Sequence, residues 1–475
     1  MIDQDLLEPE RKRKKKKKKN KKKKKLKQEL LQHGPELVQE VVRAIEEEDI
    51  EVLDEVVEAL HSADLADLFE QLTTEDRAAL VSHLGEELDP DVLTELDEVA
   101  RDHVITEMQD QHVVKAISEL ETDDAIHLLE DLDEDEQRKI LDALPEDDRR
   151  AVEEGLSYPE ESAGRLLQKK LIAVPSLWSV GKVIDFLREE SSLPEDFYEI
   201  FVVDPLHHPI GTVRLSHLLR SGREVLVSDI MDTDPKVVPV DMDQEEVAFL
   251  FRQYDLTSMG VVDQNGRLIG MITVDDVVDV IDEEVQEDIL RMAGVQDTDI
   301  LETVWEASRN RIMWLVVNLG TALLASTVIA QFDATIEQMV ALAILMPIVA
   351  SLGGNAGNQA MTVAVRALAT KELTPSNAMR VVTRELSIGL LNGSALAVLI
   401  GGLTAIWFKN PELGGVIALA MVVNVIVAGL AGIMVPLTLE KMKVDPALAS
   451  TVLVTAITDV IGFLAFLGFA AFFLL

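Results

Sequence analysis

Residues 347–359 read Pro-Ile-Val-Ala-Ser-Leu-Gly-Gly-Asn-Ala-Gly-Asn-Gln, and they lie within 28 consecutive uncharged residues, from Gln338 to Val365. Glycines, amides and a proline weaken a lipid-facing helix, but a membrane tolerates them where backbone and amide groups line a wet path. Carbonyl and carboxamide oxygens suit a hard or hydrated cation. The alternative interpretation is a glycine-rich crossing of helices. The candidate pore residues in this run are Gly353, Gly354, Asn355, Asn358 and Gln359.

Four further apolar stretches predict that this run belongs to a membrane domain. Each is long enough to cross about 30 Å of hydrocarbon at about 1.5 Å per residue. They are Ile312–Phe332, Leu386–Phe408, Leu413–Leu439 and Pro446–Leu475. The sequence therefore predicts a transmembrane domain with five helices over residues 311–475.

Asp459 is the single charge in the fifth predicted span. A carboxylate at that depth is costly unless it faces a partner, an ion or water, so Asp459 is a candidate functional residue. No basic residue within a predicted span can neutralise it. A protonated or hydrogen-bonded structural role is the alternative. Thr455, four residues earlier, completes the candidate pore set.

Basic residues between the spans predict the orientation of the chain. The second connection carries Arg366, Lys371, Arg380 and Arg384, whereas the first carries no Lys or Arg. Because basic connections stay in the cytoplasm, we expect a cytoplasmic N-terminus and a C-terminus outside the plasma or inner membrane. Small residues recur every four positions in the third span, at Gly389, Gly393, Ala397 and Gly401, and predict close helix packing.

The charge of the chain is segregated. The net charge is −41, yet residues 311–475 carry eight acidic and eight basic side chains. Residues 1–29 form a Lys-rich tail, which we expect to be disordered and solvated. Its two possible contacts are anionic lipid and the acidic middle of the chain. Nucleic acid is a poor partner for so anionic a body. The chain has no cysteine, which excludes disulfides, thiol nucleophiles and thiolate metal sites.

Residues 30–165 are predicted to form a helical cytoplasmic domain. Leu65, Leu68, Phe69 and Leu72 follow the three- and four-residue steps of a helix face. The stretch from residue 64 to 72 resembles the stretch from 124 to 132, at an offset of 60. Repeated helix pairs at this spacing predict a small superhelical solenoid.

Residues 166–284 carry a second repeat, with strands alternating with helices. Val-Val-Asp, a turn and Ile-Gly occur at residues 202–211 and again at 261–270, and Asn265-Gly266 is a strong turn signal. This pair resembles a tandem α/β CBS module. Such modules often bind adenosine nucleotides through a Thr and an Asp after the second strand. The second copy keeps Thr273 and Asp276, so one site for ATP is the most that the resemblance implies.

A connecting, plug-like helix is predicted over residues 285–310. Acidic residues crowd the approach to it, and several share one helix face because steps of three and four stay aligned. A divalent cation would relieve their mutual repulsion; a solvated charged face is the alternative. These residues are Asp275, Asp276, Asp279, Asp282, Glu283, Glu284, Glu287 and Asp288.

Taken together, residues 30–475 resemble the MgtE family of magnesium transporters and channels. The domain order, the Gly-Gly-Asn-x-Gly-x-Gln run and the lone Asp459 carry the resemblance. It implies a homodimer in the membrane lipid, with a pore between protomers lined by the second and fifth spans. Asp459 of each subunit would then face the ion, and Asn355 and Asn358 would lie near the cytoplasmic end. The sequence departs from the family at Thr451, where an Asn is frequent.

The resemblance also implies regulation. Cytoplasmic Mg²⁺ would bind acidic residues of the helical, CBS and connecting regions and close the pore. The residues that match this sensing role are Asp124, Asp255, Asp276, Asp279, Glu284, Glu287 and Asp288.

We therefore expect a non-enzymatic Mg²⁺ channel or transporter that moves magnesium into the cytoplasm down its electrochemical gradient. A phosphate-binding Walker motif is absent from the sequence. One alternative is a carrier of Co²⁺ or Mn²⁺, although oxygen ligands favour Mg²⁺. The other is a membrane-tethered CBS nucleotide sensor without conduction. Ion flux through the purified protein separates a transporter from a non-conducting sensor.

Overall fold

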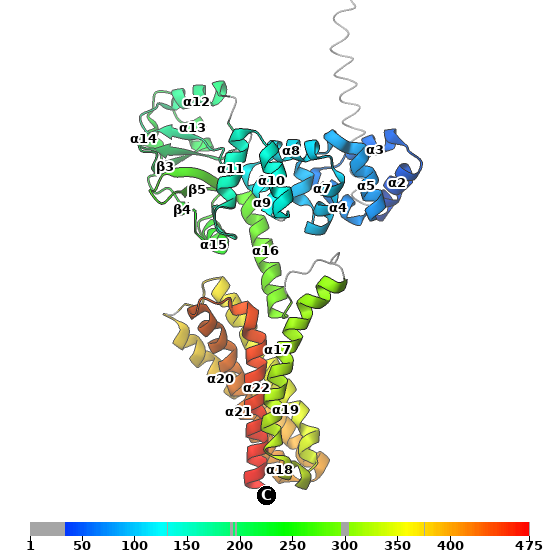
Figure 1. The fold of residues 1–475 in the computed structure, drawn as a ribbon. Coiled ribbons are helices and arrows are strands. Elements are labelled where there is room, and N and C mark those ends of the chain that lie inside the picture. The colour runs from blue at the N-terminus through cyan, green and yellow to red at the C-terminus, as the bar shows by residue number, and fades with distance from the viewer. Residues whose placement is uncertain are drawn as a thin grey trace, which may run out of the picture. The chain divides into compact units, whose positions relative to one another are not determined.

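The computed structural model of the chain describes residues 34–130, 132–190, 193–194, 197–295, 304–374 and 376–474 (Figure 1). The chain divides into two compact units, Met1–Val280 and Ile281–Leu475. The predicted Lys-rich tail, residues 1–29, lies outside the described residues, and so do residues 296–303 of the predicted connecting segment.

Short helices build the N-terminal part of the first unit. They are α2 (Gly34–Glu46), α3 (Ile50–Val57), α4 (Ser62–Gln71), α5 (Thr74–Leu84), η1 (Gly85–Glu87), α6 (Asp91–Glu95), α7 (Glu98–Glu107), α8 (Asp110–Glu119), α9 (Thr122–Glu130), α10 (Glu134–Ala143) and α11 (Glu146–Leu156). The pair α4–α5 starts 60 residues before the pair α9–α10, at Ser62 and Thr122. Phe69 and Leu129, at equivalent positions, are both fully buried in one core. The helical class and the offset of 60 are confirmed.

Two three-stranded sheets follow. The first has the order β1-β2-β3 and the second β4-β5-β6, each with a parallel and an antiparallel pairing. The elements are β1 (Ala173–Pro175), α12 (Val180–Glu189), β2 (Glu199–Val203), β3 (Pro209–Arg214), α13 (Leu215–Arg220), α14 (Val227–Ile230), β4 (Val237–Pro239), α15 (Gln244–Tyr254), β5 (Ser258–Val262) and β6 (Leu268–Thr273). The register shifts after Val202 in one sheet and after Val261 in the other, so the two copies share even this irregularity.

The repeated Val-Val-Asp ends in the same turn in both copies. Asp204 Oδ1 accepts backbone N–H bonds from Leu206 and His208, both at 2.8 Å. Asp263 Oδ1 accepts the equivalent bonds from Asn265 and Arg267, also at 2.8 Å. An aspartate that bonds the backbone two residues on stabilises such a turn, which explains why the sequence repeats it.

The two copies are joined by segments distant in sequence. Gln168, before the first copy, forms an antiparallel bridge with Met271 in β6. Phe201 of the first copy packs with Leu268 and Met271 of the second in one small core. The tandem pair therefore forms one body with the chain that precedes it.

Helix α16 (Val274–Met292) begins directly after β6. It crosses residue 285, where the sequence predicts the start of the connecting helix, because no Gly or Pro interrupts residues 274–292. Gly294, with φ +72°, ends the helix in a left-handed turn. The N–H of Val295 donates to the carbonyl of Leu290 at 2.9 Å, which closes this end.

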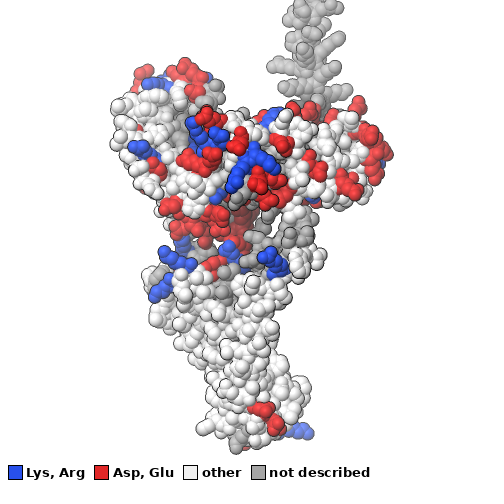
Figure 2. Space-filling view, in the orientation of Figure 1, with Lys and Arg blue, Asp and Glu red and all other residues white. Residues whose placement is uncertain are grey.

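The second unit continues with α17 (Val304–Ala330), α18 (Asp333–Gln338), α19 (Ala341–Ala369), α20 (Ala378–Phe408), α21 (Pro411–Lys441) and α22 (Pro446–Phe473). Among the described residues, five of its helices are long and apolar enough to cross a membrane. Figure 2 shows their sides almost free of charge, while acidic side chains gather on the first unit. The prediction of five helices long and apolar enough to span a membrane is confirmed.

The small residues of the third span pack closely against another helix, as predicted, and the structure shows that this helix is the fourth span. Gly389, Gly393, Ala397 and Gly401 are the buried small residues of α20. A Cβ on Gly401 would lie 2.8 Å from the carbonyl oxygen of Gly414 in α21. This approach leaves no room for a side chain.

Gly401→Ala is expected to destabilise the membrane unit by about 1–3 kcal/mol, because overpacking forces backbone atoms apart. Gly402→Ala is the matched control, since a Cβ there meets nothing within 4 Å. Thermal unfolding of the purified protein in detergent measures both. Equal unfolding temperatures for the two variants would contradict this close contact.

Candidate functional site

The glycine- and amide-rich run is helical throughout, with Pro347 inside α19. Two of its glycines are helix contacts. A Cβ on Gly353 would lie 2.2 Å from Asn424 Nδ2 of α21, and one on Gly357 would lie 2.5 Å from Val454 Cγ1 of α22. The interpretation as a helix crossing therefore accounts for Gly353 and Gly357.

The remaining polar residues of the run lie on a different side of α19. Asn355 and Gln359 are exposed, and a Cβ on Gly354 would meet nothing within 4 Å. Asn358 is half-buried, and its Oδ1 has no hydrogen-bond partner among the described residues. These amides thus remain available to an ion, to water or to a second copy of the chain.

Asp459 is half-buried on α22, the helix that packs beside α19. Thr455, one turn earlier, shares its face, since residues four apart are neighbours on a helix. Thr458 is fully buried, and its Oγ1 donates to the carbonyl of Thr455 at 2.9 Å. The structure therefore brings the two helices that carry the candidate pore residues side by side.

A second group of candidates forms an acidic cluster in the first unit, between α9 and the start of α16. Asp123 is only 7% exposed, and no side chain of the described residues makes a geometrically good hydrogen bond to its carboxylate oxygens, although Gln168 lies close enough to lower its pKa. Asp276 Oδ2 accepts bonds from Thr273 Oγ1 at 2.7 Å and from Gln168 Nε2 at 3.0 Å. We call Glu121, Asp123, Asp124, Asp275 and Asp276 the α9–α16 cluster.

Burial, and then the charges of their neighbours, raises the pKa of the carboxylates in this cluster. Burial, then the charges of Asp276 and Glu121, raises the pKa of Asp124 to about 7. Burial, followed by Asp276 and Asp124, raises the pKa of Asp123. Burial also raises the pKa of Asp276, despite the bond from Thr273. A nearby cation would stabilise the charged form of each of these carboxylates.

The cluster fits a hydrated cation better than a directly ligated one. Within the described ranges, no group of three or more His, Asp or Glu side chains has metal-ligating geometry. Mg²⁺ usually keeps several of its waters, so carboxylates can hold it at longer range. The buried carboxylate of Asp123, whose oxygens accept no well-aligned hydrogen bond from the residues that the structure describes, is the observation that fits such an ion.

The structure unites some predicted sensing residues and separates others. Asp124 and Asp276 come together, and the charge of Asp279 acts on Glu95 of α6. Asp255 is instead the exposed C-cap of α15, with φ +51°. Sequence reasoning missed Glu121 and Asp123, although the acidic doublet at residues 123–124 was a usable signal.

The C-terminal half of α16 forms a separate acidic group with α22. Arg291 Nη1 donates to Asp445 Oδ2 at 2.6 Å, and Arg291 also pairs with Glu287. Burial, then the charge of Asp445, raises the pKa of Asp288. Glu284 lies one turn before this group on α16. Sequence reasoning missed both Arg291 and Asp445.

The end of α16 is also held by uncharged contacts. Thr451 Oγ1 donates to the carbonyl of Met292 at 2.6 Å. Met292 packs on a core formed by Met361 and Val365 of α19 and Ala447 and Val454 of α22. Thr451, the position that departs from the family pattern, therefore ties the connecting helix to the fifth span.

The candidate nucleotide residues bond to one another. Gln168 Nε2 donates to Thr273 Oγ1 at 3.1 Å as well as to Asp276. Asp276 thus belongs both to the Thr–Asp pair and to the α9–α16 cluster. In the first copy, Arg214 and His217 occupy the positions of this pair.

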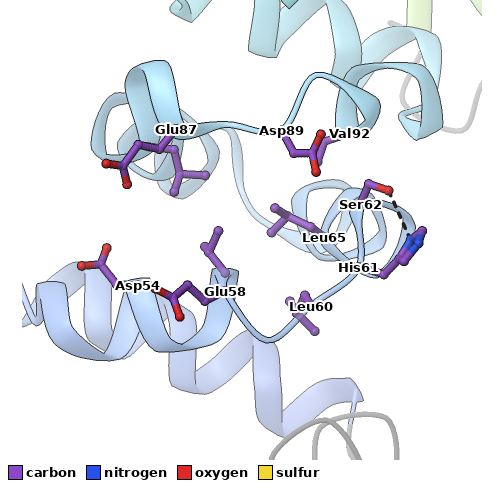
Figure 3. Close-up of a pocket in the computed structure, with 11 residues that line it drawn as sticks. Asp54, Glu58, Leu60, His61, Ser62, Leu65, Glu87, Asp89 and Val92 are labelled. Carbon is purple, nitrogen blue, oxygen red and sulfur yellow. Dashed lines mark hydrogen bonds between the residues drawn. The ribbon is translucent and has the colours of Figure 1, made fainter. Parts of the chain in front are cut away.

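A hollow of about 390 Å³ lies among α3, α4 and α6 in the helical domain (Figure 3). Asp54, Glu58, Glu87 and Asp89 line it. Asp54 Oδ1 lies 2.9 Å from His83 Nε2. The candidate site residues from the sequence analysis are not among the residues that line this hollow.

The α9–α16 cluster predicts that the first unit is more stable at pH 5 than at pH 8 when divalent cations are chelated. The folded-state pKa of Asp124, about 7, exceeds its ordinary value of 3.8. The folded state therefore binds more protons between these values, and its stability falls as pH rises through about 7. After allowance for solvent screening, Asp124 contributes about 2 kcal/mol to the difference in unfolding free energy between pH 5 and pH 8.

Thermal unfolding of the full chain in chelator, from pH 5 to 8, measures this slope. Asp124→Asn should flatten it, because an amide mimics the protonated acid and does not titrate. Asp110→Asn, on the exposed start of α8, is the control. An unchanged slope in Asp124→Asn would show that the titration of Asp124 does not contribute to the pH dependence of stability.

Three family models match the chain. They are "Divalent cation transporter" over residues 346–469, "MgtE intracellular N domain" over 60–161 and "CBS domain" over 227–283. The first covers the amide-rich run and Asp459, the second covers Asp124, and the third covers Asp276. None of them describes an enzyme.

Curated relatives match over most of their length. The magnesium transporter MgtE of Thermus thermophilus is 38% identical over 321 residues, which cover 66% of this chain and 70% of the relative. That of Bacillus subtilis is 32% identical over 322 residues, 67% and 71% of the two chains. Among solved structures, the cytosolic domain of the Mg²⁺ channel MgtE in complex with ATP is 32% identical. It covers 51% of this chain and 99% of that chain, with a TM-score of 0.48.

Proposed function

This chain belongs to the MgtE family of magnesium transporters, and we propose that it conducts Mg²⁺ into the cytoplasm and closes when cytoplasmic Mg²⁺ binds its acidic residues. The observation that carries the transport proposal is the half-buried Asp459 on a membrane helix beside the amide-bearing α19. In a multi-pass transporter, an intramembrane carboxylate marks the path of the transported cation.

Conduction follows from the chemistry of these side chains. Asp459 attracts the ion, and the oxygens of Asn355, Asn358 and Gln359 replace part of its outer hydration. A homodimer would place two copies of Asp459 on one path. Binding through water keeps the ion exchangeable, which conduction requires.

The direction of flow follows from charge. With the basic second connection in the cytoplasm, the N-terminal unit is cytoplasmic. Each elementary charge that moves inward gains about 2.3 kcal/mol per 100 mV, and a divalent ion gains twice that. Uptake therefore requires no hydrolysis of ATP.

Closure of the pore is explained by linkage: Mg²⁺ binding and the compact, closed conformation of the protein favour each other. Asp123, Asp124 and Asp276 would hold Mg²⁺ in the α9–α16 cluster, and Glu284, Glu287 and Asp288 would hold it near the end of α16. Ions that bind the compact closed form better than the open form shift the population toward closure. At low Mg²⁺ the same carboxylates repel one another and favour opening.

A nucleotide such as ATP is a second proposed ligand. Thr273 and Asp276 support it, because they follow the second strand of the second CBS copy. Since Asp276 also belongs to the α9–α16 cluster, nucleotide and Mg²⁺ would affect the same carboxylate. Binding of ATP to the purified chain, with and without Mg²⁺, tests this ligand by calorimetry.

Flux into proteoliposomes tests the function. Purified protein should take up Mg²⁺ under an inside-negative potential, and raising Mg²⁺ on the cytoplasmic face should slow uptake. Co²⁺ and Mn²⁺ in the same assay test the competing substrates. Absence of any divalent flux would favour the non-conducting sensor.

A further inference from the structure

Asn424 is a fully buried polar residue in α21, the most enclosed of the membrane helices. Its Nδ2 donates to the carbonyl oxygen of Val349 in α19 at 2.9 Å. Its Oδ1 has no hydrogen-bond partner among the residues that the structure describes. Burying an amide is unfavourable unless it is hydrogen-bonded, so a bond across two helices is the reason for its placement.

Two glycines from different helices make room for this amide. A Cβ on Gly353 of α19 would lie 2.2 Å from Asn424 Nδ2, and a Cβ on Gly462 of α22 would lie 2.8 Å from the same atom. The Oδ1 atom would be 3.0 Å from both added carbons. The carboxamide therefore occupies the junction where α19, α21 and α22 meet.

This junction lies close along the chain to the candidate pore residues. Gly353 stands two residues before Asn355, and Gly462 stands three residues after Asp459. Three residues correspond to about 4.5 Å along a helix. A change in the separation or register of α19 and α22 here would move Asp459 relative to the amides of α19.

We infer that Asn424 is a positioning residue for ion transport. Its amide holds α19 through the bond to Val349 and packs against Gly462 of α22, so it sets the two helices relative to each other near the level of Asp459. The inference rests on the proposed function. Asn424 does not touch the ion in this role. It acts by holding the two helices whose side chains do.

Asn424→Leu is the first test, because leucine has a similar shape but cannot donate to Val349. We expect Mg²⁺ uptake to fall at least about tenfold, since misplacement by about 1 Å is enough for such losses. We also expect the half-saturating Mg²⁺ concentration or the preference for Mg²⁺ over Co²⁺ to change. Thr404→Val on α20 is the control: its hydroxyl is also buried and has no hydrogen-bond partner among the described residues, and its loss should leave both unchanged.

The second test pairs Asn424 with its glycine. Gly353→Ala alone should abolish uptake, because the added carbon meets the amide. Gly353→Ala combined with Asn424→Ala should recover part of the uptake, because the smaller side chain frees the space that the methyl group needs. Such mutual rescue identifies this contact rather than general damage.

The outcomes separate this inference from the transport proposal. If wild-type protein shows no Mg²⁺ flux, the proposed function fails. If wild type conducts and Asp459→Asn does not, but Asn424→Leu conducts with unchanged ion dependence, the role of Asn424 is wrong. A loss of uptake that matches the loss of folded protein, with unchanged half-saturation and ion preference, would also overturn it in favour of a purely structural role.

Discussion

Asp459→Asn is expected to reduce Mg²⁺ uptake by at least a factor of about 100. A divalent ion about 5 Å from a carboxylate interacts with it by about 7 kcal/mol at an effective dielectric constant of about 20. Each 1.4 kcal/mol is about a factor of ten, so loss of even half this attraction exceeds the stated effect. The substitution keeps the shape of the side chain, and uptake into proteoliposomes at fixed potential measures it.

The control for this prediction is Asp333→Asn. Asp333 is an exposed carboxylate at the start of α18, outside the five spans. The same chemical change there should leave uptake within about twofold of wild type, since screened surface charges interact weakly. Undiminished uptake by folded Asp459→Asn protein would remove Asp459 from the ion path.

The double variant Asp124→Asn, Asp276→Asn is expected to lose inhibition by cytoplasmic Mg²⁺. Two carboxylates that face a divalent ion through water contribute several kcal/mol. Part of this is offset, because the variant also removes two charges that are unfavourable in the folded state: burial, and then neighbouring carboxylates, raise the pKa of both acids. We expect the half-inhibiting Mg²⁺ concentration to rise at least about tenfold.

The matched control neutralises two acids of the same domain outside the α9–α16 cluster. Asp110 and Asp147 are exposed at the starts of α8 and α11. Asp110→Asn with Asp147→Asn removes the same formal charge and should retain inhibition. Inhibition measured at several internal Mg²⁺ concentrations compares the pairs, and equal curves would exclude the cluster as the sensor.

The membrane helices and both repeats could be predicted because their signals are local. Uncharged length marks a span, a four-residue step of small residues marks the packing face of α20, and Val-Val-Asp marks a turn that Asp204 and Asp263 stabilise. Each signal is contained in one continuous stretch of sequence, and the repeats show the same stretch twice. Physical rules that act within one helix or one hairpin are therefore sufficient.

The acidic clusters could be predicted only in part, because their members are distant in sequence. Asp276 was conspicuous within an acidic run, but its neighbour Asp123 becomes visible only once α9 lies beside α16. Asp445 and Arg291 pair across 154 positions. The same reason hid Asn424, whose meaning depends on glycines from two other helices.

The antiparallel bridge between Gln168 and Met271 has a consequence for biosynthesis. Gln168 also reaches Asp276, 108 positions later, so this contact cannot form until the whole CBS pair has been made. At about 5–20 residues per second, that interval is about 5–20 s. The first membrane helix follows within only about 1–6 s at the same rate. The carboxylates of α9 therefore meet those of α16 just before membrane insertion begins, and until then the helical repeat folds free of their repulsion.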